Sequence, residues 1–208
     1  SLVVGHAGNE GFCASDPTAL LEYTHDVWFM DDEEMAQITK EGCKFFDFDG
    51  VEHEKMSMHL DWDAAMTNRG EYAHFMLKEI HEQPEVLAHT LLGRIAGNKV
   101  DLSAELDWTP EEAAKIKRIH FVACGTSHYA TIVAEHIMET LGNFEIRTEV
   151  ASEYRYRNIP IDEETLAVFV SQSGETADTL HAARLAKSRG AKCLVITNVR
   201  GSTIHREV

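Results

Sequence analysis

Apolar residues follow three different patterns along the chain, and these patterns divide it into three segments. From residue 2 to about residue 58, short apolar runs alternate with polar turns, which is typical of β-strands. Between about residues 63 and 117 the apolar positions recur every three or four residues, as in helices. After Arg118, apolar runs of strand length alternate with helical segments. The pattern predicts an α/β chain with a β-rich segment (1–62), a helical connector (63–117) and a sheet-and-helix domain (118–208).

In the first segment, strands are predicted at residues 2–4, 27–30, 35–39 and 43–48. Asp49-Gly50 should form a hairpin turn after the last of them. A short helix should begin at Pro17, because Pro fits the first helical position and Asp16 can cap the free amides.

In the connector, Pro84 is predicted to end one helix and start another, because it lacks an amide donor and clashes with the preceding turn. Thr109 and Pro110 should begin a further short helix, with Thr109 as its cap.

The last segment reads as a parallel sheet, because its strands are continuous apolar runs rather than alternating ones. Strands are predicted at 119–123, 146–150, 166–170 and 193–197, and helices at 129–141 and 176–189. The last seven residues read as the first turn of a helix, and we expect both ends of the chain to be cut from a longer protein.

Composition narrows the classes of partner. The formal net charge of −16 disfavours nucleic acid and anionic membrane surfaces, which require a basic face. No apolar run approaches the roughly 18 residues of a membrane span, and the start lacks a signal peptide, so we predict a cytoplasmic location. Cys13, Cys43, Cys124 and Cys193 are scattered and should be free thiols. No ligand spacing occurs among the 12 His residues, so we predict neither a metal nor a cofactor.

Two runs of hydroxyl side chains follow predicted strands and precede predicted helices. They are Cys-Gly-Thr-Ser at 124–127 and Ser-Gln-Ser-Gly-Glu-Thr at 171–176. Glycine lets the backbone approach an anion, and a helix N-terminus offers it unpaired N–H groups. The runs match neither the dinucleotide nor the nucleoside-triphosphate motif. They therefore predict a phosphate site, with ordinary helix capping as the alternative.

The run 171–179, with 124–127 upstream, resembles the sugar isomerase (SIS) domain pattern. Residues 151–157 (Ala-Ser-Glu-Tyr-Arg-Tyr-Arg) and 78–84 (Lys-Glu-Ile-His-Glu-Gln-Pro) are similar to the glucosamine 6-phosphate synthase family in particular, and residues 14–16 to the end of its glutaminase domain. This resemblance implies the end of an Ntn-type glutaminase domain in 1–62, a linker in 63–117, and part of a flavodoxin-like SIS domain in 118–208.

The family resemblance also implies an activity: amination and isomerisation of fructose 6-phosphate to glucosamine 6-phosphate with nitrogen from glutamine. It assigns the binding of the sugar phosphate to six side chains of this chain: Thr126, Ser127, Ser171, Gln172, Ser173 and Thr176. It implies a homodimer. The family's nucleophilic Cys should precede residue 1, and its ring-opening Glu, His and Lys should follow residue 208. We therefore expect no catalytic residue here, an inactive isolated piece, and glutamine binding in the preceding part.

Two other functions are alternatives: a sugar-phosphate-sensing SIS module of a regulator, and an SIS deglycase or isomerase without a glutaminase domain. The acidic β-rich start disfavours the regulator, which would carry a basic helix-turn-helix there. The same β-rich start also disfavours a deglycase or isomerase, which would lack the glutaminase domain. Among other polar residues, His128 is predicted to be a surface side chain rather than a general base. Glu153, Arg155 and Arg157 are expected on a short interface helix, and residues 31–34 in a solvated turn.

Overall fold

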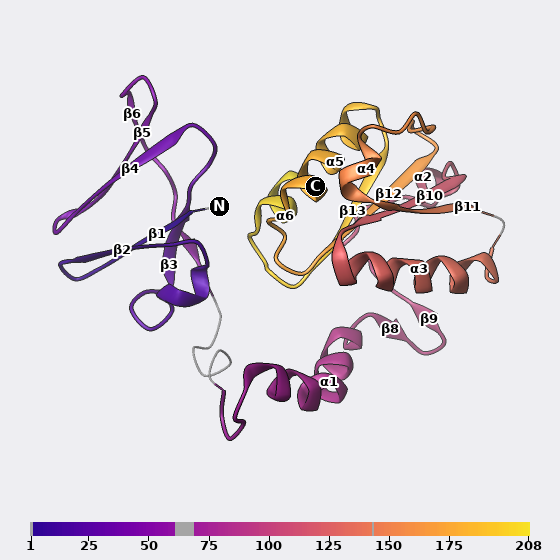
Figure 1. Ribbon diagram of the computed structural model, residues 1–208, viewed down its shortest axis with the longest axis horizontal. Helices are drawn as coiled ribbons and strands as arrows, with labels where there is room; N and C mark the ends of the chain where they lie inside the picture. Colours follow the sequence, from indigo (N-terminus) through magenta and orange to yellow (C-terminus); the bar gives the residue numbers. More distant parts are fainter. Residues whose placement is uncertain (1, 61–68, 143) are drawn as a thin grey trace. The chain divides into compact units, whose positions relative to one another are not determined.

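Two units, Ser1–Asp101 and Leu102–Val208, make up the chain in the computed structural model, which describes residues 2–60, 69–142 and 144–208 (Figure 1). Antiparallel strands and a long helix are the main elements of the first unit, and a parallel sheet covered by helices builds the second. Among the described residues, no helix combines the length and the apolar composition needed to cross a membrane. The predicted start of the connector at residue 63 lies outside the described residues.

Besides a two-stranded hairpin described below, the described part of the first unit contains two antiparallel sheets, with strand orders β2-β1-β3-β7 and β4-β5-β6. Their elements are β1 (Val3–Ala7), β2 (Glu10–Ala14), the 3₁₀ helix η1 (Pro17–Leu20), β3 (Asp26–Phe29), β4 (Glu34–Thr39), β5 (Gly42–Asp47), β6 (Glu52–His53) and β7 (Met58–His59). Successive side chains of a strand point to opposite faces. Val3 accordingly joins the apolar cluster that holds Leu20 of η1, whereas Val4 joins the cluster that holds Phe45 of β5. Strand β1 is therefore buried on both faces.

All four predicted strands of this unit are confirmed, as β1, β3, β4 and β5, but β2 was not predicted. Its alternation is weak, because Gly11 interrupts it and Cys13 is exposed. Asp16 caps η1 as predicted, with its carboxylate accepting the Thr18 amide at 2.8 Å. The predicted turn at Asp49-Gly50 joins β5 to β6.

Helix α1 (Phe75–Leu91) contradicts the prediction for the connector, because it continues through Pro84. A proline removes one hydrogen bond of the helix, to the carbonyl four residues earlier. No residue of α1 is buried, so water can replace that donor at Ile80. The helical prediction also fails after α1, where β8 (Ile95–Ala96) and β9 (Lys99–Val100) form a small hairpin.

The second unit alternates strands with helices, as predicted. It comprises α2 (Pro110–Ala113), β10 (Arg118–Ala123), α3 (Gly125–Glu139), β11 (Glu145–Val150), α4 (Ala151–Tyr154), β12 (Thr165–Ser171), α5 (Ala177–Ser188), β13 (Lys192–Thr197) and α6 (Thr203–Glu207). The strands are parallel and lie in the order β11-β10-β12-β13. Thr109 caps α2 with the reciprocal bonds of a capping box, also as predicted.

Helices cover both faces of this sheet (Figure 1). Phe121 of β10 lies in the cluster that includes Met138 of α3, whereas its neighbour Val122 lies in the cluster that includes Ala183 of α5 and Tyr154 of α4. Only the central strands β10 and β12 are largely buried, and the outer strands β11 and β13 are mostly half-buried. The prediction of fully buried strands thus holds for the centre of the sheet.

A hydrogen bond inside the core connects the sheet to α4. His120 of β10 and Tyr154 are both fully buried, and His120 Nδ1 lies 3.0 Å from the Tyr154 hydroxyl oxygen. Burial lowers the pKa of His120 to about 4 and raises the pKa of Tyr154. Both side chains are therefore neutral near pH 7, which is the form that a dry core tolerates.

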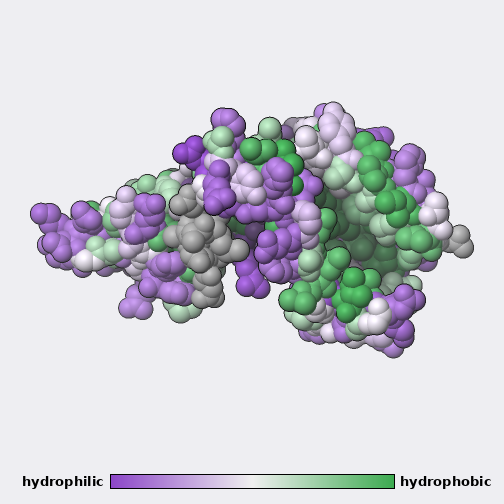
Figure 2. All heavy atoms as spheres, turned by 90° about the horizontal axis from the view of Figure 1, so that it is seen from below, coloured by the Kyte–Doolittle hydropathy of each residue, from purple (hydrophilic) through white to green (hydrophobic). Residues whose placement is uncertain are grey.

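Helix α3 exposes an apolar stripe on its outer side. Tyr129, Val133 and Ile137 of the helix, and Leu141 just after its end, follow at four-residue steps and are all more than half exposed. In Figure 2, apolar residues gather on the right of the view, the side on which α3 lies in Figure 1. The second unit thus presents apolar surface as well as a polar one.

Candidate functional site

The two predicted hydroxyl runs lie at the same edge of the parallel sheet. Ala123, the last residue of β10, is in register with Val170 of β12 on one side and with Val150 of β11 on the other. Ser171, the last residue of β12, is in register with Thr197 of β13. Strands β10 and β12 are neighbours, so residues 124–127 and 171–176 follow adjacent strand ends.

The chain turns in opposite directions at these two strands. From β10 it passes through α3 to β11 on one side, and from β12 it passes through α5 to β13 on the other. Helices α3 and α5 consequently lie on opposite faces of the sheet. In open α/β sheets, the crevice between two such diverging connections is the usual place for a ligand.

At the first junction, Cys124 is the N-cap of α3 and makes no side-chain capping bond. Gly125 follows with φ of 57°, a left-handed conformation that other residues adopt at a cost. Thr126 is exposed and Ser127 is half-buried. The first turn of this 15-residue helix thus presents hydroxyl groups and amides that no side chain caps.

At the second junction, the hydroxyl loop, residues 171–176, is held by its own hydrogen bonds. Ser171 is buried, and its Oγ accepts the Gly174 amide at 3.1 Å and lies 3.3 Å from Thr176 Oγ1. Ser173 is half-buried, and its Oγ accepts the Glu175 amide at 3.2 Å. Ser171 therefore shapes the loop from inside, while Ser173 and Thr176 lie closer to its surface.

Gln172 is exposed, and its backbone joins the loop to the end of β13. The Gln172 carbonyl accepts the Asn198 amide and the Thr197 hydroxyl, each at 3.4 Å. The Gln172 side chain projects from a backbone that the neighbouring strand holds.

The electrostatics of the two junctions suit a weakly held anion. Their residues include a single charged side chain, that of Glu175, so an anion placed there would meet neutral donors and the positive ends of α3 and α5. A helix dipole contributes about 0.3 to 1 kcal/mol, and a hydrogen bond to a charged group about 1.5 to 3 kcal/mol. A few of these suffice for millimolar binding, which is about −4 kcal/mol.

Glu175 is a residue of this region to which sequence reasoning gave no role. Its carboxylate accepts two hydrogen bonds from Thr203, at the start of α6. The two residues are 28 positions apart, and no local pattern connects them. Only the fold reveals the contact.

Three other polar residues, His128, Arg155 and Arg157, were not predicted to belong to the binding site. His128, in the first turn of α3, is half-buried rather than on the surface, and its Nδ1 has no hydrogen-bond partner in the described part of the chain. Arg157 pairs with the buried carboxylate of Glu149. Arg155 lies over the Tyr156 ring and contacts His181. Both Arg side chains thus already have partners within the second unit.

The four thiols are free, and none is fully buried. Cys124 is half-buried and packs against the core at the end of its strand, as predicted. Burial raises the pKa of Cys193 to about 11 and also raises the pKa of Cys43, which keeps both as thiols near pH 7. A thiol in this state is a poor nucleophile.

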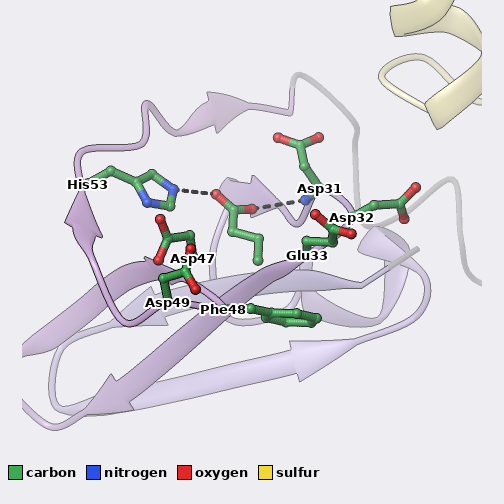
Figure 3. A pocket seen from close by; sticks show the side chains of 8 residues that line it. Asp31, Asp32, Glu33, Asp47, Phe48, Asp49 and His53 are labelled. Atoms are coloured by element: carbon green, nitrogen blue, oxygen red, sulfur yellow. Dashed lines mark hydrogen bonds and ion pairs between the residues drawn. The ribbon is translucent and has the colours of Figure 1, made fainter.

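A separate cavity in the first unit, of about 400 Å³, is strongly acidic (Figure 3). Its lining residues are Asp31, Asp32, Glu33, Glu34, Asp47, Phe48, Asp49 and His53. No group of His, Cys, Asp or Glu side chains in the described residues has an arrangement that could hold a metal ion. The negative charge here repels a phosphate, so the cavity does not compete with the hydroxyl runs as an anion site.

Glu34 corrects the prediction that residues 31–34 form a solvated turn. Its side chain is 8% exposed and is bound by Lys55 at 2.8 Å. It is also bound by His53 at 2.6 Å, a contact that Figure 3 marks with a dashed line. Burial raises the pKa of Glu34, but the hydrogen bonds from Lys55, the Asp31 amide and His53 outweigh it and lower the pKa overall. Only the three preceding acids are solvated.

Comparison with known proteins agrees with this geometry. The SIS domain family matches residues 113–208, which span the parallel sheet and its helices. Those residues have the parallel sheet and the α/β character of an SIS domain. The C-terminal domain of glucosamine-fructose-6-phosphate aminotransferase from Francisella tularensis is similar in structure, with a TM-score of 0.62 and 40% identity over 67% of this chain and 40% of that one.

The similarity extends beyond the SIS domain. Glutamine–fructose-6-phosphate aminotransferase (isomerizing) from Clostridium tetani is 44% identical over 99% of this chain, and the protein of that name from Symbiobacterium thermophilum is 46% identical over 99%. The chain is thus a relative of these aminotransferases along its length, and it spans 34% of the length of each.

Proposed function

We propose that this chain supplies sugar-phosphate-binding loops to a glutamine–fructose-6-phosphate aminotransferase, which converts fructose 6-phosphate and glutamine to glucosamine 6-phosphate and glutamate. The observation that carries the proposal is the placement of two hydroxyl-rich runs at adjacent ends of parallel strands. The names of the relatives, at 44% and 46% identity, favour the aminotransferase over the sensing and deglycase alternatives.

Within the site, Ser173 and Thr176 meet the phosphate, together with the free amides of the first turn of α5. Ser171 acts through its bond to the Gly174 amide, which shapes the loop around the anion. Gln172, Thr126 and Ser127 reach phosphate or sugar oxygens from the rim. These are binding roles, and bond-making belongs to other parts of the parent enzyme.

The proposal extends to the organisation of the parent protein. Residues 1–62 form the end of a glutaminase domain, 63–117 a linker and 118–208 part of the first SIS domain. The parent enzyme is a cytoplasmic homodimer that binds glutamine through its glutaminase domain. The antiparallel sheets of the first unit and the parallel sheet of the second support a division between two domains of different kinds.

The decisive experiment incubates the full-length natural protein with amide-¹⁵N-glutamine and fructose 6-phosphate, and measures the sugar product by mass spectrometry. Labelled glucosamine 6-phosphate is the expected result. Binding of fructose 6-phosphate without a labelled amine would reject the aminotransferase and leave the sensing or deglycase function.

Ser173→Ala tests the site itself. Loss of a hydroxyl that meets a charged oxygen should weaken fructose 6-phosphate binding by about 1 to 3 kcal/mol in calorimetry. Ser188→Ala is the matched control, because Ser188 is exposed at the other end of α5. Equal affinity of the wild type and Ser173→Ala would remove Ser173 from the site.

A further inference from the structure

Glu175 connects the hydroxyl loop to the segment that follows β13. Its Oε1 accepts the backbone amide of Thr203 at 2.7 Å, and its Oε2 accepts the Thr203 hydroxyl at 2.8 Å. The side chain is thus held by both donors of one residue. Hydrogen bonds to an ionised acceptor are about twice as strong as neutral ones, so this is a firm connection.

The neighbouring residues strengthen the same connection. The Gly174 carbonyl accepts the Ile204 amide at 3.1 Å. Ser202 is 1% exposed, and its side chain packs directly against the α-carbon of Gly174. Residues 202–204 therefore contact residues 174 and 175 by hydrogen bonds and by packing, and the fully buried Ser202 leaves little room for movement.

The connection continues to a hydroxyl of the site. The amide of Glu175 donates to Ser173 Oγ at 3.2 Å. Thr203 holds the carboxylate of Glu175, and the backbone of Glu175 holds Ser173. The position of the Ser173 hydroxyl is thus linked to the contact that Glu175 makes 28 residues further along the chain, at Thr203.

The charge of Glu175 is opposite to what direct recognition of a phosphate requires. Two negative groups near each other repel, and the repulsion grows where water is partly excluded. A ligand-contacting role for this carboxylate is therefore unfavourable, whereas a role through Thr203 is consistent with its hydrogen bonds.

We propose that Glu175 is a positioning residue, which holds the hydroxyl loop in its anion-binding shape by bridging to Thr203. This inference rests on the proposed function, because it assumes that the loop binds the phosphate of a sugar phosphate.

The test measures affinity in the full-length natural protein. Glu175→Gln keeps the size of the side chain, but its amide nitrogen faces one of the two Thr203 donors. Calorimetry should show binding of fructose 6-phosphate and of inorganic phosphate weakened by about tenfold each. If Glu175 acted only through its charge, the same variant would bind both anions more tightly. The direction of the change thus separates positioning from electrostatics.

Three further variants guard against a merely structural effect. Glu207→Gln removes a comparable carboxylate, which bridges α6 to Arg184 of α5 without touching the loop, and it should leave both affinities unchanged. Thr203→Val removes only the hydroxyl donor and should weaken binding about threefold, whereas Thr203→Ser should bind like the wild type. The melting temperature of each variant, measured alongside, reports any loss of stability separately from the affinity of the folded protein.

Unchanged or tighter binding by Glu175→Gln would overturn the inference. If that variant does not fold, wild-type affinity in Thr203→Val would overturn it instead. Binding by the wild type that Ser173→Ala weakens and Glu175→Gln does not would reject the positioning role alone. Absence of any binding by the wild type would reject the proposed function and, with it, this inference.

Discussion

Alanine at Gly174 and at Gly125 should have very different costs, although both glycines have left-handed backbones. The φ angles are 67° and 57°. An L-residue in this conformation costs about 1 to 2 kcal/mol, so this part of the cost is shared. A Cβ at Gly125 would meet no atom within 4 Å, whereas a Cβ at Gly174 would lie 2.1 Å from Ser202 Oγ. Overpacking of this kind adds about 1 to 3 kcal/mol.

We therefore expect Gly125→Ala to lower the free energy of unfolding by about 1 kcal/mol and Gly174→Ala by about 3 kcal/mol. Urea unfolding should be followed by hydrogen exchange of peptides from β12, which reports the second unit separately from the first. Equal losses in the two variants would refute the reasoning, because they would show that Ser202 moves aside freely.

A third variant identifies the clashing atoms. Ser202→Gly removes the Oγ and the Cβ that would lie 2.1 and 2.5 Å from the new methyl group. The Ser202 hydroxyl has no hydrogen-bond partner in the described residues, so its loss breaks no known bond. Ser202→Gly should destabilise the wild type but partly restore Gly174→Ala. Equal effects in both backgrounds would show that the two positions are not coupled.

Two further predictions concern stability. Burial lowers the pKa of His120 to about 4 in the folded protein, whereas the unfolded chain has an ordinary His with a pKa of about 6.5. Below about pH 6.5 the unfolded chain therefore takes up a proton that the folded protein does not. The free energy of unfolding should fall as pH drops from 6.5 through 4, by up to about 3 kcal/mol. His120→Phe should remove that part of the pH dependence of the urea midpoint, and an unchanged pH dependence would assign it to other groups. Pro84→Ala should restore a hydrogen bond inside α1 and slow amide exchange around residue 84, stabilising the helix by up to about 3 kcal/mol. Unchanged exchange there would mean that the proline costs this helix nothing.

The parallel sheet could be predicted from sequence because its central strands are continuous apolar runs of strand length. The weakly patterned β2 could not, since its pairing with β1 and the packing of Phe12 and Ala14 on an apolar cluster are tertiary contacts. Pro84 misled the helix prediction because its clash and lost bond are tolerated on an exposed helix. Local propensity decides an element only where tertiary contacts and solvent do not oppose it.

For the site, sequence spacing located the hydroxyl runs at strand ends, because strand-to-helix junctions are local features. It could not distinguish the internal role of Ser171 from the more exposed position of Ser173, which depends on how the loop folds back. Nor could it find the bond between Glu175 and Thr203, which only the packing of α6 creates. Whether the six predicted side chains bind a sugar phosphate stays a prediction.

The order of the strands also determines when this domain can form during synthesis. Arg118 at the start of β10 pairs with Thr165 of β12, which lies 47 residues later in the chain. At a synthesis rate of about 5 to 20 residues per second, the apolar strand β10 waits several seconds before its second neighbour leaves the ribosome. Until then only β11 can cover one of its edges. A nascent chain that pauses between residues 150 and 165 would expose this strand for longer, so this stretch is where slow translation would most favour aggregation.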